Sequence, residues 1–163
     1  MNKVILICGK ICSGKTHYCK MLMSSSTAVL LSCDELLTSI ASKDLGEDHD
    51  NLLSHIKTYL LKKACDVVSA GADVILDWGF WSRTERNTVS NYFSEKQISF
   101  EWHYVDIAYD EWIQNIKTRN LEVTSGLVSA YYIDSGLLSK HNSLFEKPST
   151  QEIDIWYNNH RNQ

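Results

Sequence analysis

Eight residues near the N-terminus have types and spacing suited to binding phosphate, since Gly9 to Thr16 read Gly-Lys-Ile-Cys-Ser-Gly-Lys-Thr. In such a loop (a Walker A motif) backbone N–H groups surround the phosphates of a nucleoside triphosphate, the lysine reaches the β- and γ-phosphates, and the last hydroxyl binds Mg²⁺. Gly9 and Gly14 would allow the backbone angles that turn successive N–H groups toward the β-phosphate. A helix expected from about Lys15 would add its positive N-terminal end. The sequence therefore predicts ATP and Mg²⁺ as ligands, with Thr16 on the metal and the nucleotide contacted by Gly9, Lys10, Cys12, Ser13, Gly14, Lys15 and Thr16.

Two aspartates follow predicted strands and would supply further chemistry. Asp34 comes after the apolar run 28–32, where it would be either the base for an acceptor hydroxyl or the cap of the following helix. Asp77 follows the run 74–76 and resembles a Walker B carboxylate, which would hold Mg²⁺ through water or contact the acceptor. The next residue is Trp78, whereas ATP-driven motors usually place there a glutamate that activates water. Transfer of phosphate to a bound acceptor is therefore favoured over hydrolysis.

Three arginines lie where a transferring phosphoryl group would need positive charge. Arg83 and Arg86 open the helix that follows Asp77, a place where the helix dipole disfavours cations unless an anion is bound. They would contact either the acceptor or only solvent. Arg119 lies at the predicted end of a later helix, before a lid. It would reach the γ-phosphate, or be an ordinary cation at a helix C-terminus.

A sheet is needed to bring these residues together, and apolar runs predict its strands. Strands are expected at 4–8, 28–32, 74–76 and 100–105, and helices at 16–23, 52–67, 82–93 and 109–120, with a polar surface loop over 42–51. Alternation over 153–157 predicts a fifth strand, although 149–152 would also cap a helix. This order predicts a three-layer α/β/α fold of the P-loop NTPase kind, with about five parallel strands and the site at their carboxyl ends. Residues 1–163 are expected to form one domain, with a partly helical lid at about 122–147.

Composition excludes several classes of protein. A chain of 163 residues with 44% apolar residues and a net charge of −4 is expected to fold, and not to coat nucleic acid. Nowhere do eighteen apolar residues follow one another, so no membrane span is expected. The five cysteines include no Cys-x-x-Cys pair, which indicates reduced thiols in a cytoplasmic protein.

With these residues identified, the chain resembles the small P-loop kinases grouped with AAA-type ATP-binding proteins. That group includes zeta-toxin and chloramphenicol phosphotransferase relatives and the kinase domain of polynucleotide 5′-hydroxyl kinases. The resemblance covers nearly the whole chain, and its most specific part is the Asp-Trp-Gly-Phe-Trp block at 77–81. The matching segments are 9–16, 31–35, 75–86, 117–120 and 145–148.

The resemblance implies roles for several of these residues. Asp34 would be the acceptor base, and Arg119 a lid arginine near the phosphates. Arg83 or Arg86 would meet the acceptor or its phosphate. The segment after Pro148 would lie near the adenine.

The function expected from the sequence is an ATP-dependent kinase that phosphorylates a hydroxyl of a small-molecule or nucleotide-like acceptor. Trp78, Phe80 and Trp81 would stack on a planar acceptor or pack in the core. A short nucleic-acid end is less favoured as acceptor, because the chain is acidic overall. The alternatives are a non-enzymatic nucleotide-gated module whose lid recruits a partner, or a simple NTPase. The sequence indicates neither the acceptor nor an oligomeric state.

Overall fold

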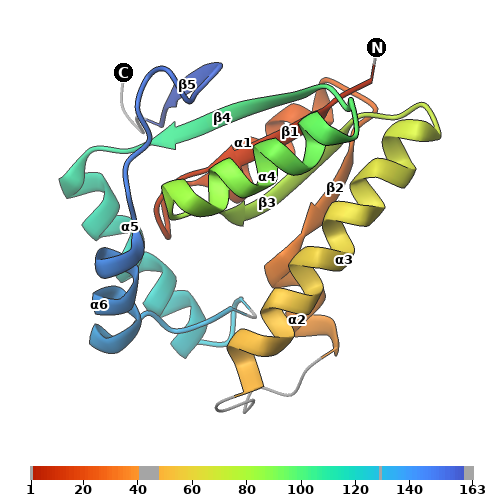
Figure 1. Cartoon of the computed structure of the whole chain (residues 1–163). Coiled ribbons are helices and arrows are strands. Elements are labelled where there is room, and N and C mark those ends of the chain that lie inside the picture. The colour runs from red at the N-terminus through yellow and green to blue at the C-terminus, as the bar shows by residue number, and fades with distance from the viewer. Residues whose placement is uncertain (1, 41–47, 129, 160–163) are drawn as a thin grey trace.

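Five parallel strands form one sheet in the order β2-β3-β1-β4-β5 (Figure 1). The computed structural model describes residues 2–40, 48–128 and 130–159. The strands are β1 (Val4–Cys8), β2 (Val29–Ser32), β3 (Val74–Gly79), β4 (Phe100–Asp106) and β5 (Ile155–Asn158). Helices connect them, as parallel strands require. These helices are α1 (Lys15–Ser24), α2 (Cys33–Ile40), α3 (His49–Ser69), α4 (Arg83–Glu95), α5 (Tyr109–Thr124) and α6 (Ser135–Leu144).

The central strand β1 is buried on both faces, which explains its unbroken run of apolar residues. Val4, Leu6 and Cys8 pack in the core beneath α3 and α4, together with side chains of β3 and β4. Ile5 and Ile7 point the other way and pack against α1. Each fully buried aliphatic side chain contributes about 1.5–3 kcal/mol of transfer free energy, so this alternation holds a helical layer on each face.

Two further clusters lie beyond the carboxyl ends of the strands. Apolar side chains of α2 pack on α3, with Leu37 and Ile56 among the most buried. Apolar side chains of α5 pack against α6 and the segment before it, with Trp112 at the centre. In Figure 1 α2 lies at the lower right and α6 at the lower left. Residues of both clusters line one cavity at the ends of the strands.

The predicted three-layer α/β/α fold with a five-stranded parallel sheet is confirmed. A fifth strand does form, but over Ile155–Asn158 and not from 153, while 149–152 makes a turn in which the Ser149 backbone N–H donates to Glu152 at 2.9 Å. Of the loop predicted over 42–51, residues 41–47 lie outside the described part, and α3 already begins at His49. No helix in the described residues is both long and apolar enough to cross a membrane.

Two boundaries differ from the sequence prediction, and both concern the site. Strand β3 continues through Asp77 to Gly79, because it pairs with the end of β1 beyond the apolar run. Helix α5 does not end near Arg119 but runs to Thr124, since nothing in residues 119–124 breaks a helix. The lid segment contains a second regular helix, α6, capped by the Asp134 side chain.

Candidate functional site

The Walker loop joins β1 to α1 and contains two residues in the left-handed region. Gly14 has φ of 96°, as predicted, but the other is Cys12, with φ of 57°. Gly9 is not among the residues with positive φ, so the prediction that its backbone angles need glycine is wrong. Its requirement is space: a Cβ there would lie 2.9 Å from the carbonyl oxygen of Val105 and 2.8 Å from Ser13 Oγ.

Side chains from α5 and α6 hold the outer part of this loop. The Ile11 backbone N–H donates to Nε2 of His141 at 3.3 Å, and the indole N–H of Trp112 donates to the Ile11 carbonyl at 2.7 Å. Asn115 Nδ2 donates to the Cys12 carbonyl at 3.0 Å. The loop conformation is thus fixed by helices more than ninety residues away in the chain.

The segment after β5 supports the loop from its other side. Nδ2 of Asn159 donates to the Ser13 carbonyl at 2.8 Å. The same nitrogen would lie 2.2 Å from a Cβ at position 14. Gly14 therefore has two reasons to be glycine, its positive φ and the approach of Asn159.

Lys15 lies folded over the loop. Its Nζ donates to the carbonyls of Lys10 at 2.7 Å and Gly9 at 3.3 Å. Lys10 itself extends outward, with Nζ 4.6 Å from the centre of the Trp112 ring. The Lys15 ammonium is therefore held beside the loop backbone, where a phosphate would be its natural partner.

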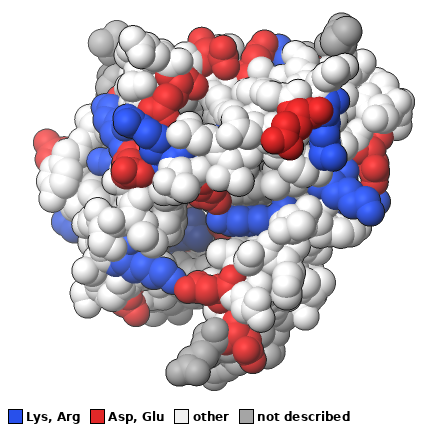
Figure 2. Space-filling view, viewed as in Figure 1, with Lys and Arg blue, Asp and Glu red and all other residues white. Residues whose placement is uncertain are grey.

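A cavity of about 510 Å³ opens where the strands end. Figure 2 shows this face of the molecule hollowed in its middle, with both basic and acidic side chains near the hollow. We call one wall the loop side, lined by Ile11, Cys12, Gly14, Lys15, Thr16, Gly79, Trp81, Asn115, Thr118, Arg119, Glu122 and Leu137. We call the other wall the α2–α3 side, lined by Asp34, Leu37, His49, Leu53, Lys57, Asp77, Trp78, Glu85 and Tyr131. A cavity of this size accommodates a small molecule.

Asp34 and Asp77 lie in this one cavity, as their strand-end positions predicted. Asp77 is 7% exposed. The pKa of its carboxyl is raised, mainly because burial disfavours the charged form. The positive charge of Lys15 lowers this pKa, and the negative charge of Asp34 raises it. Asp34 is exposed at the start of α2, and among the described residues its side chain makes no hydrogen bond to the helix backbone, whereas Ser32 Oγ accepts from the Glu35 N–H at 3.3 Å. The Asp34 carboxylate therefore lines the cavity and does not cap the helix.

The aromatic residues at and just after the end of β3 lie partly in the cavity and partly in the core. The pairing of β1 with β3 shifts at Trp78, so that Ile7 faces Asp77 and Cys8 faces Gly79. Trp78 lines the cavity at this irregularity, and its indole N–H is buried without a hydrogen-bond partner among the described residues. Phe80 is fully buried and belongs to the core.

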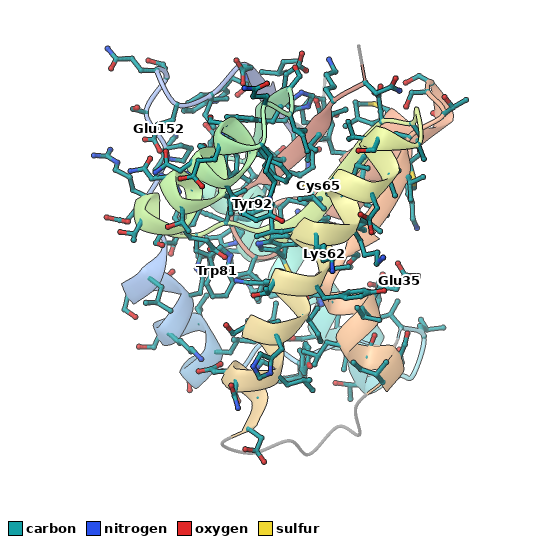
Figure 3. The ribbon with its side chains drawn as sticks, turned by 45° about the vertical axis from the view of Figure 1, so that its right-hand side comes forward. Glu35, Lys62, Cys65, Trp81, Tyr92 and Glu152 are labelled. Carbon is teal, nitrogen blue, oxygen red and sulfur yellow. The ribbon has the colours of Figure 1, made fainter. Side chains whose placement is uncertain are left out.

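Trp81, the last residue of the block, lines the loop side of the cavity. Its ring lies edge-on to the ring of His141, with centroids 4.8 Å apart. Figure 3 shows Trp81 between α4 and α6. It therefore connects the end of β3 to the helix that holds the Walker loop.

The α2–α3 side contains two pairs that the sequence analysis missed. Nζ of Lys57 on α3 lies 2.5 Å from the carboxylate of Glu85 on α4. The rings of His49 and Tyr131 meet edge to face with centroids 5.9 Å apart. Burial, and then the charge of Asp34, raise the pKa of Tyr131, so this residue of the lid segment lies near Asp34. Each pair joins distant parts of the chain, and no local spacing could have indicated it.

Arg119 lines the loop side, within α5 and one turn before its end. Its Nε is buried and has no hydrogen-bond partner among the described residues. Burial raises the pKa of the Cys12 thiol, whereas the positive charges of Arg119 and Lys15 lower it. Arg119 thus lines the cavity together with the Walker loop, from a position within α5.

Arg83 and Arg86 do not line the cavity. Arg86 is buried, and its guanidinium donates to the carboxylate of Glu152 at 3.0 Å and to the carbonyls of Phe80 and Glu146, each at 3.1 Å. Arg83 is exposed and pairs with the same Glu152 at 3.5 Å. Glu152 lies beside α4, away from the cavity (Figure 3). The structure gives these two arginines a structural setting in place of the predicted contact with an acceptor.

Among the described residues, no group of three or more His, Cys, Asp or Glu side chains is placed to bind a metal. Mg²⁺, however, retains several waters in proteins and binds through one or two side chains plus substrate phosphates. Thr16 and the buried Asp77 carboxylate offer such an incomplete oxygen set in the same cavity. They fit a magnesium ion that arrives with a triphosphate.

Solved structures with this fold include several kinases. A sugar kinase from Janibacter sp. HTCC2649 matches with a TM-score of 0.64 and 13% identity, over 97% of this chain and 86% of that one. The APS kinase CysC of Mycobacterium tuberculosis, solved with AMPPNP and APS, gives 0.58 and 19%, over 99% and 90%. Kti12 of Chaetomium thermophilum, solved with ADP-AlF3, gives 0.67 and 15%, over 95% and 87%. At these identities the likeness shows a shared fold.

Sequence comparison identifies the family directly. No curated protein matches the chain closely enough to be counted as a relative. An AAA domain family matches residues 4–130, a span that contains the Walker loop, both cavity aspartates and Arg119. This agrees with the resemblance to small P-loop kinases grouped with AAA-type ATP-binding proteins. The chain belongs to this AAA domain family.

Proposed function

We propose that this protein transfers the γ-phosphoryl group of ATP to a hydroxyl group of a bound acceptor. The observation that carries the proposal is the single cavity shared by the Walker loop, Asp34 and Asp77. A triphosphate on the loop would direct its γ-phosphate toward the two carboxylates. The kinases that share this fold support the same class of reaction.

The loop side would bind the donor. Lys15 would exchange its two backbone carbonyls for the β- and γ-phosphates, while loop N–H groups and the start of α1 face the phosphates. Thr16 and Asp77 would hold the Mg²⁺ that accompanies ATP. When bound, this ion neutralises charge that develops on the phosphate oxygens. Arg119 would add a second positive charge from α5.

Asp34 would act as the general base. As the acceptor oxygen bonds to the γ-phosphorus, the bond from phosphorus to the β–γ bridging oxygen breaks and ADP leaves. The hydroxyl proton passes to the Asp34 carboxylate. The exposed position of Asp34 at the start of α2 supports this role, since its side chain can meet an incoming hydroxyl there.

The Asp34→Asn variant tests the proposal. It should bind ATP as the wild type does and lose about 10²–10⁴-fold in phosphoryl transfer, because the amide cannot take the proton. Glu35→Gln is the matched control: Glu35 is the next residue on α2, it is exposed, and it does not line the cavity, so transfer should be unchanged. The measurement is transfer from [γ-³²P]ATP, with ATP affinity measured separately.

Other outcomes separate the alternatives. Full transfer by Asp34→Asn would remove Asp34 as the base. Phosphate release at the same rate with and without acceptors would indicate an NTPase. ATP-dependent protection of residues 122–147 from protease, without any turnover, would indicate a nucleotide-gated binding module.

A further inference from the structure

The α2–α3 side of the cavity carries more negative than positive charge. Asp34, Asp77 and Glu85 supply three carboxylates, and Lys57 supplies the one Lys or Arg cation among the described residues of this wall. Lys57 pairs with Glu85, and Asp77 lies within the influence of Lys15, so among the described residues Asp34 is the one carboxylate of this wall without a cation beside it. An anionic group entering this wall would meet the like charge of Asp34, which disfavours it in a partly desolvated site.

The one lysine of this wall is already paired. Nζ of Lys57 contacts the Glu85 carboxylate, and both side chains are more than two-thirds buried, at 29% and 25% exposure. To bind a phosphate or carboxylate of an acceptor, Lys57 would have to leave Glu85 buried and unpaired. The pair therefore removes the charge that an anionic acceptor would need.

Apart from His49, whose ring contacts that of Tyr131, the rest of this wall is aliphatic or aromatic. Leu37 is 1% exposed, Leu53 is partly buried, and the rings of Trp78 and Tyr131 complete the surface. The Trp78 indole N–H is a buried donor that lacks a partner among the described residues. Such a donor needs an acceptor oxygen, and a hydroxyl or carbonyl oxygen of a ligand could supply it without carrying a charge.

From this wall, and resting on the proposed function, we infer that the acceptor is an uncharged alcohol with an apolar ring or chain. Its apolar part would contact Leu37, Leu53 and Trp78, and its hydroxyl would lie at Asp34. Sugar phosphates, sulfonucleotides and nucleic-acid ends are thereby disfavoured. The cavity of about 510 Å³, part of which the triphosphate must enter, also fits a small acceptor better than an oligonucleotide.

Two pools of acceptors test the inference with [γ-³²P]ATP and Mg²⁺. One pool contains uncharged alcohols, such as 2-phenylethanol, nitrophenyl diols and cyclohexanediols. The other contains anions, such as glucose 6-phosphate, nucleoside monophosphates and a 5′-hydroxyl hexanucleotide. The expected result is labelled product in the uncharged pool only.

A pair of variants makes the test specific to this wall. Glu85→Gln frees Lys57 and removes one carboxylate, so it should raise transfer to the anionic pool relative to the uncharged pool by about tenfold. Glu95→Gln is the control, because Glu95 is exposed at the far end of the same helix. It should leave the ratio unchanged.

The remaining outcomes are distinguishable. Wild-type label mainly in the anionic pool, or an unchanged ratio in Glu85→Gln, overturns the inference and leaves the proposed function standing. Label in neither pool counts against the proposed function, and the inference falls with it.

Discussion

Arg86 joins three segments of the chain through one buried side chain. Its side chain is 2% exposed and binds Glu152, the Phe80 carbonyl and the Glu146 carbonyl. The Glu146 carboxylate in turn accepts from the Arg83 backbone N–H at 2.7 Å. These bonds fix the turn after β3 and hence the aromatic residues that line the cavity.

The Arg86→Ala variant should lose about 3 kcal/mol of unfolding free energy, because it leaves Glu152 and three carbonyls without their buried donor. Arg83→Ala removes an exposed partner of the same Glu152 and should change stability by less than about 0.5 kcal/mol. Urea denaturation of both variants measures this. If Arg86→Ala keeps wild-type stability but binds the acceptor more weakly, the prediction that Arg86 contacts the acceptor is favoured again.

The sequence predicted the residues of the Walker loop better than those of the α2–α3 side of the cavity. The Walker loop is contiguous, so one short pattern contains its main groups. The sequence did not predict the positive φ of Cys12, because a positive φ is expected from residue type mainly at glycine and asparagine. The pairing of Lys57 with Glu85 spans 28 residues and two helices, so neither neighbourhood reveals it.

Helix α6 acts on the Walker loop through His141. Burial lowers the pKa of this imidazole below the usual 6.5, the Asn142 side chain opposes that fall, and Lys15 and Lys10 add to it. With its Nδ1–H directed to Asn142 Oδ1, at 3.2 Å, neutral His141 can accept the Ile11 N–H at Nε2. A second proton would remove that acceptor and place a cation next to two lysines.

Nucleotide affinity should therefore fall in acid. Because the folded-state pKa is lowered, His141 stays neutral below pH 6.5, and its contribution to stability is complete above 6.5 and lost as pH falls through the folded pKa. In His141→Phe the ring packing is kept and the acceptor is absent. Its ATP affinity should be weaker than wild type at about pH 8 and approach the wild-type value as pH falls through the lowered folded-state pKa of His141.

The control for this titration is His103, the other histidine that is buried among the described residues. His103 contacts Tyr18 at 3.0 Å and Glu101 at 3.3 Å, and burial also lowers its pKa. His103→Phe should retain the wild-type pH profile of ATP affinity, since this ring does not contact the loop. Both variants bind the same ATP, so the protonation of the nucleotide cancels in the comparison. A constant affinity ratio between wild type and His141→Phe at every pH would contradict the argument.

At the scale of helices and strands, the pattern of apolar residues predicted which segments are regular but placed some of their ends wrongly. Apolar runs predicted β1 and β2 to within a residue. The five residues of β1 are all buried, as its composition indicates, whereas β2 lies at the edge of the sheet and none of its four residues is fully buried. The ends of α5 and β3 depend on what they pack against. Helix α5 continues past Arg119 along the surface of the segment before α6, where Asn120 bonds to both backbone groups of Ile133.

For the whole molecule, ATP with Mg²⁺ should stabilise the fold by binding only the folded state. At about 100 times the dissociation constant, the gain is about 2.7 kcal/mol. For a chain of this length that raises Tm by roughly 5–10 °C. Lys15→Ala should lose most of the shift, whereas Lys20→Ala, an exposed lysine further along the same helix, should retain it. Thermal melts with and without ATP·Mg²⁺ measure the difference, and equal shifts in both variants would place the nucleotide elsewhere.

The residues that hold the Walker loop in place are synthesised long after the loop itself. The loop lies within the first sixteen residues of the chain. The side chains that donate to its carbonyls come much later: Trp112, Asn115 and Asn159 follow the residues that they contact by 101, 103 and 146 positions. A ribosome makes the phosphate-binding motif first and supplies its last support at the end of β5. A nascent chain halted before Asn159 would carry a complete motif and an incomplete site. In a cell, full nucleotide binding would therefore require that β5 and Asn159 have been made and have joined the sheet.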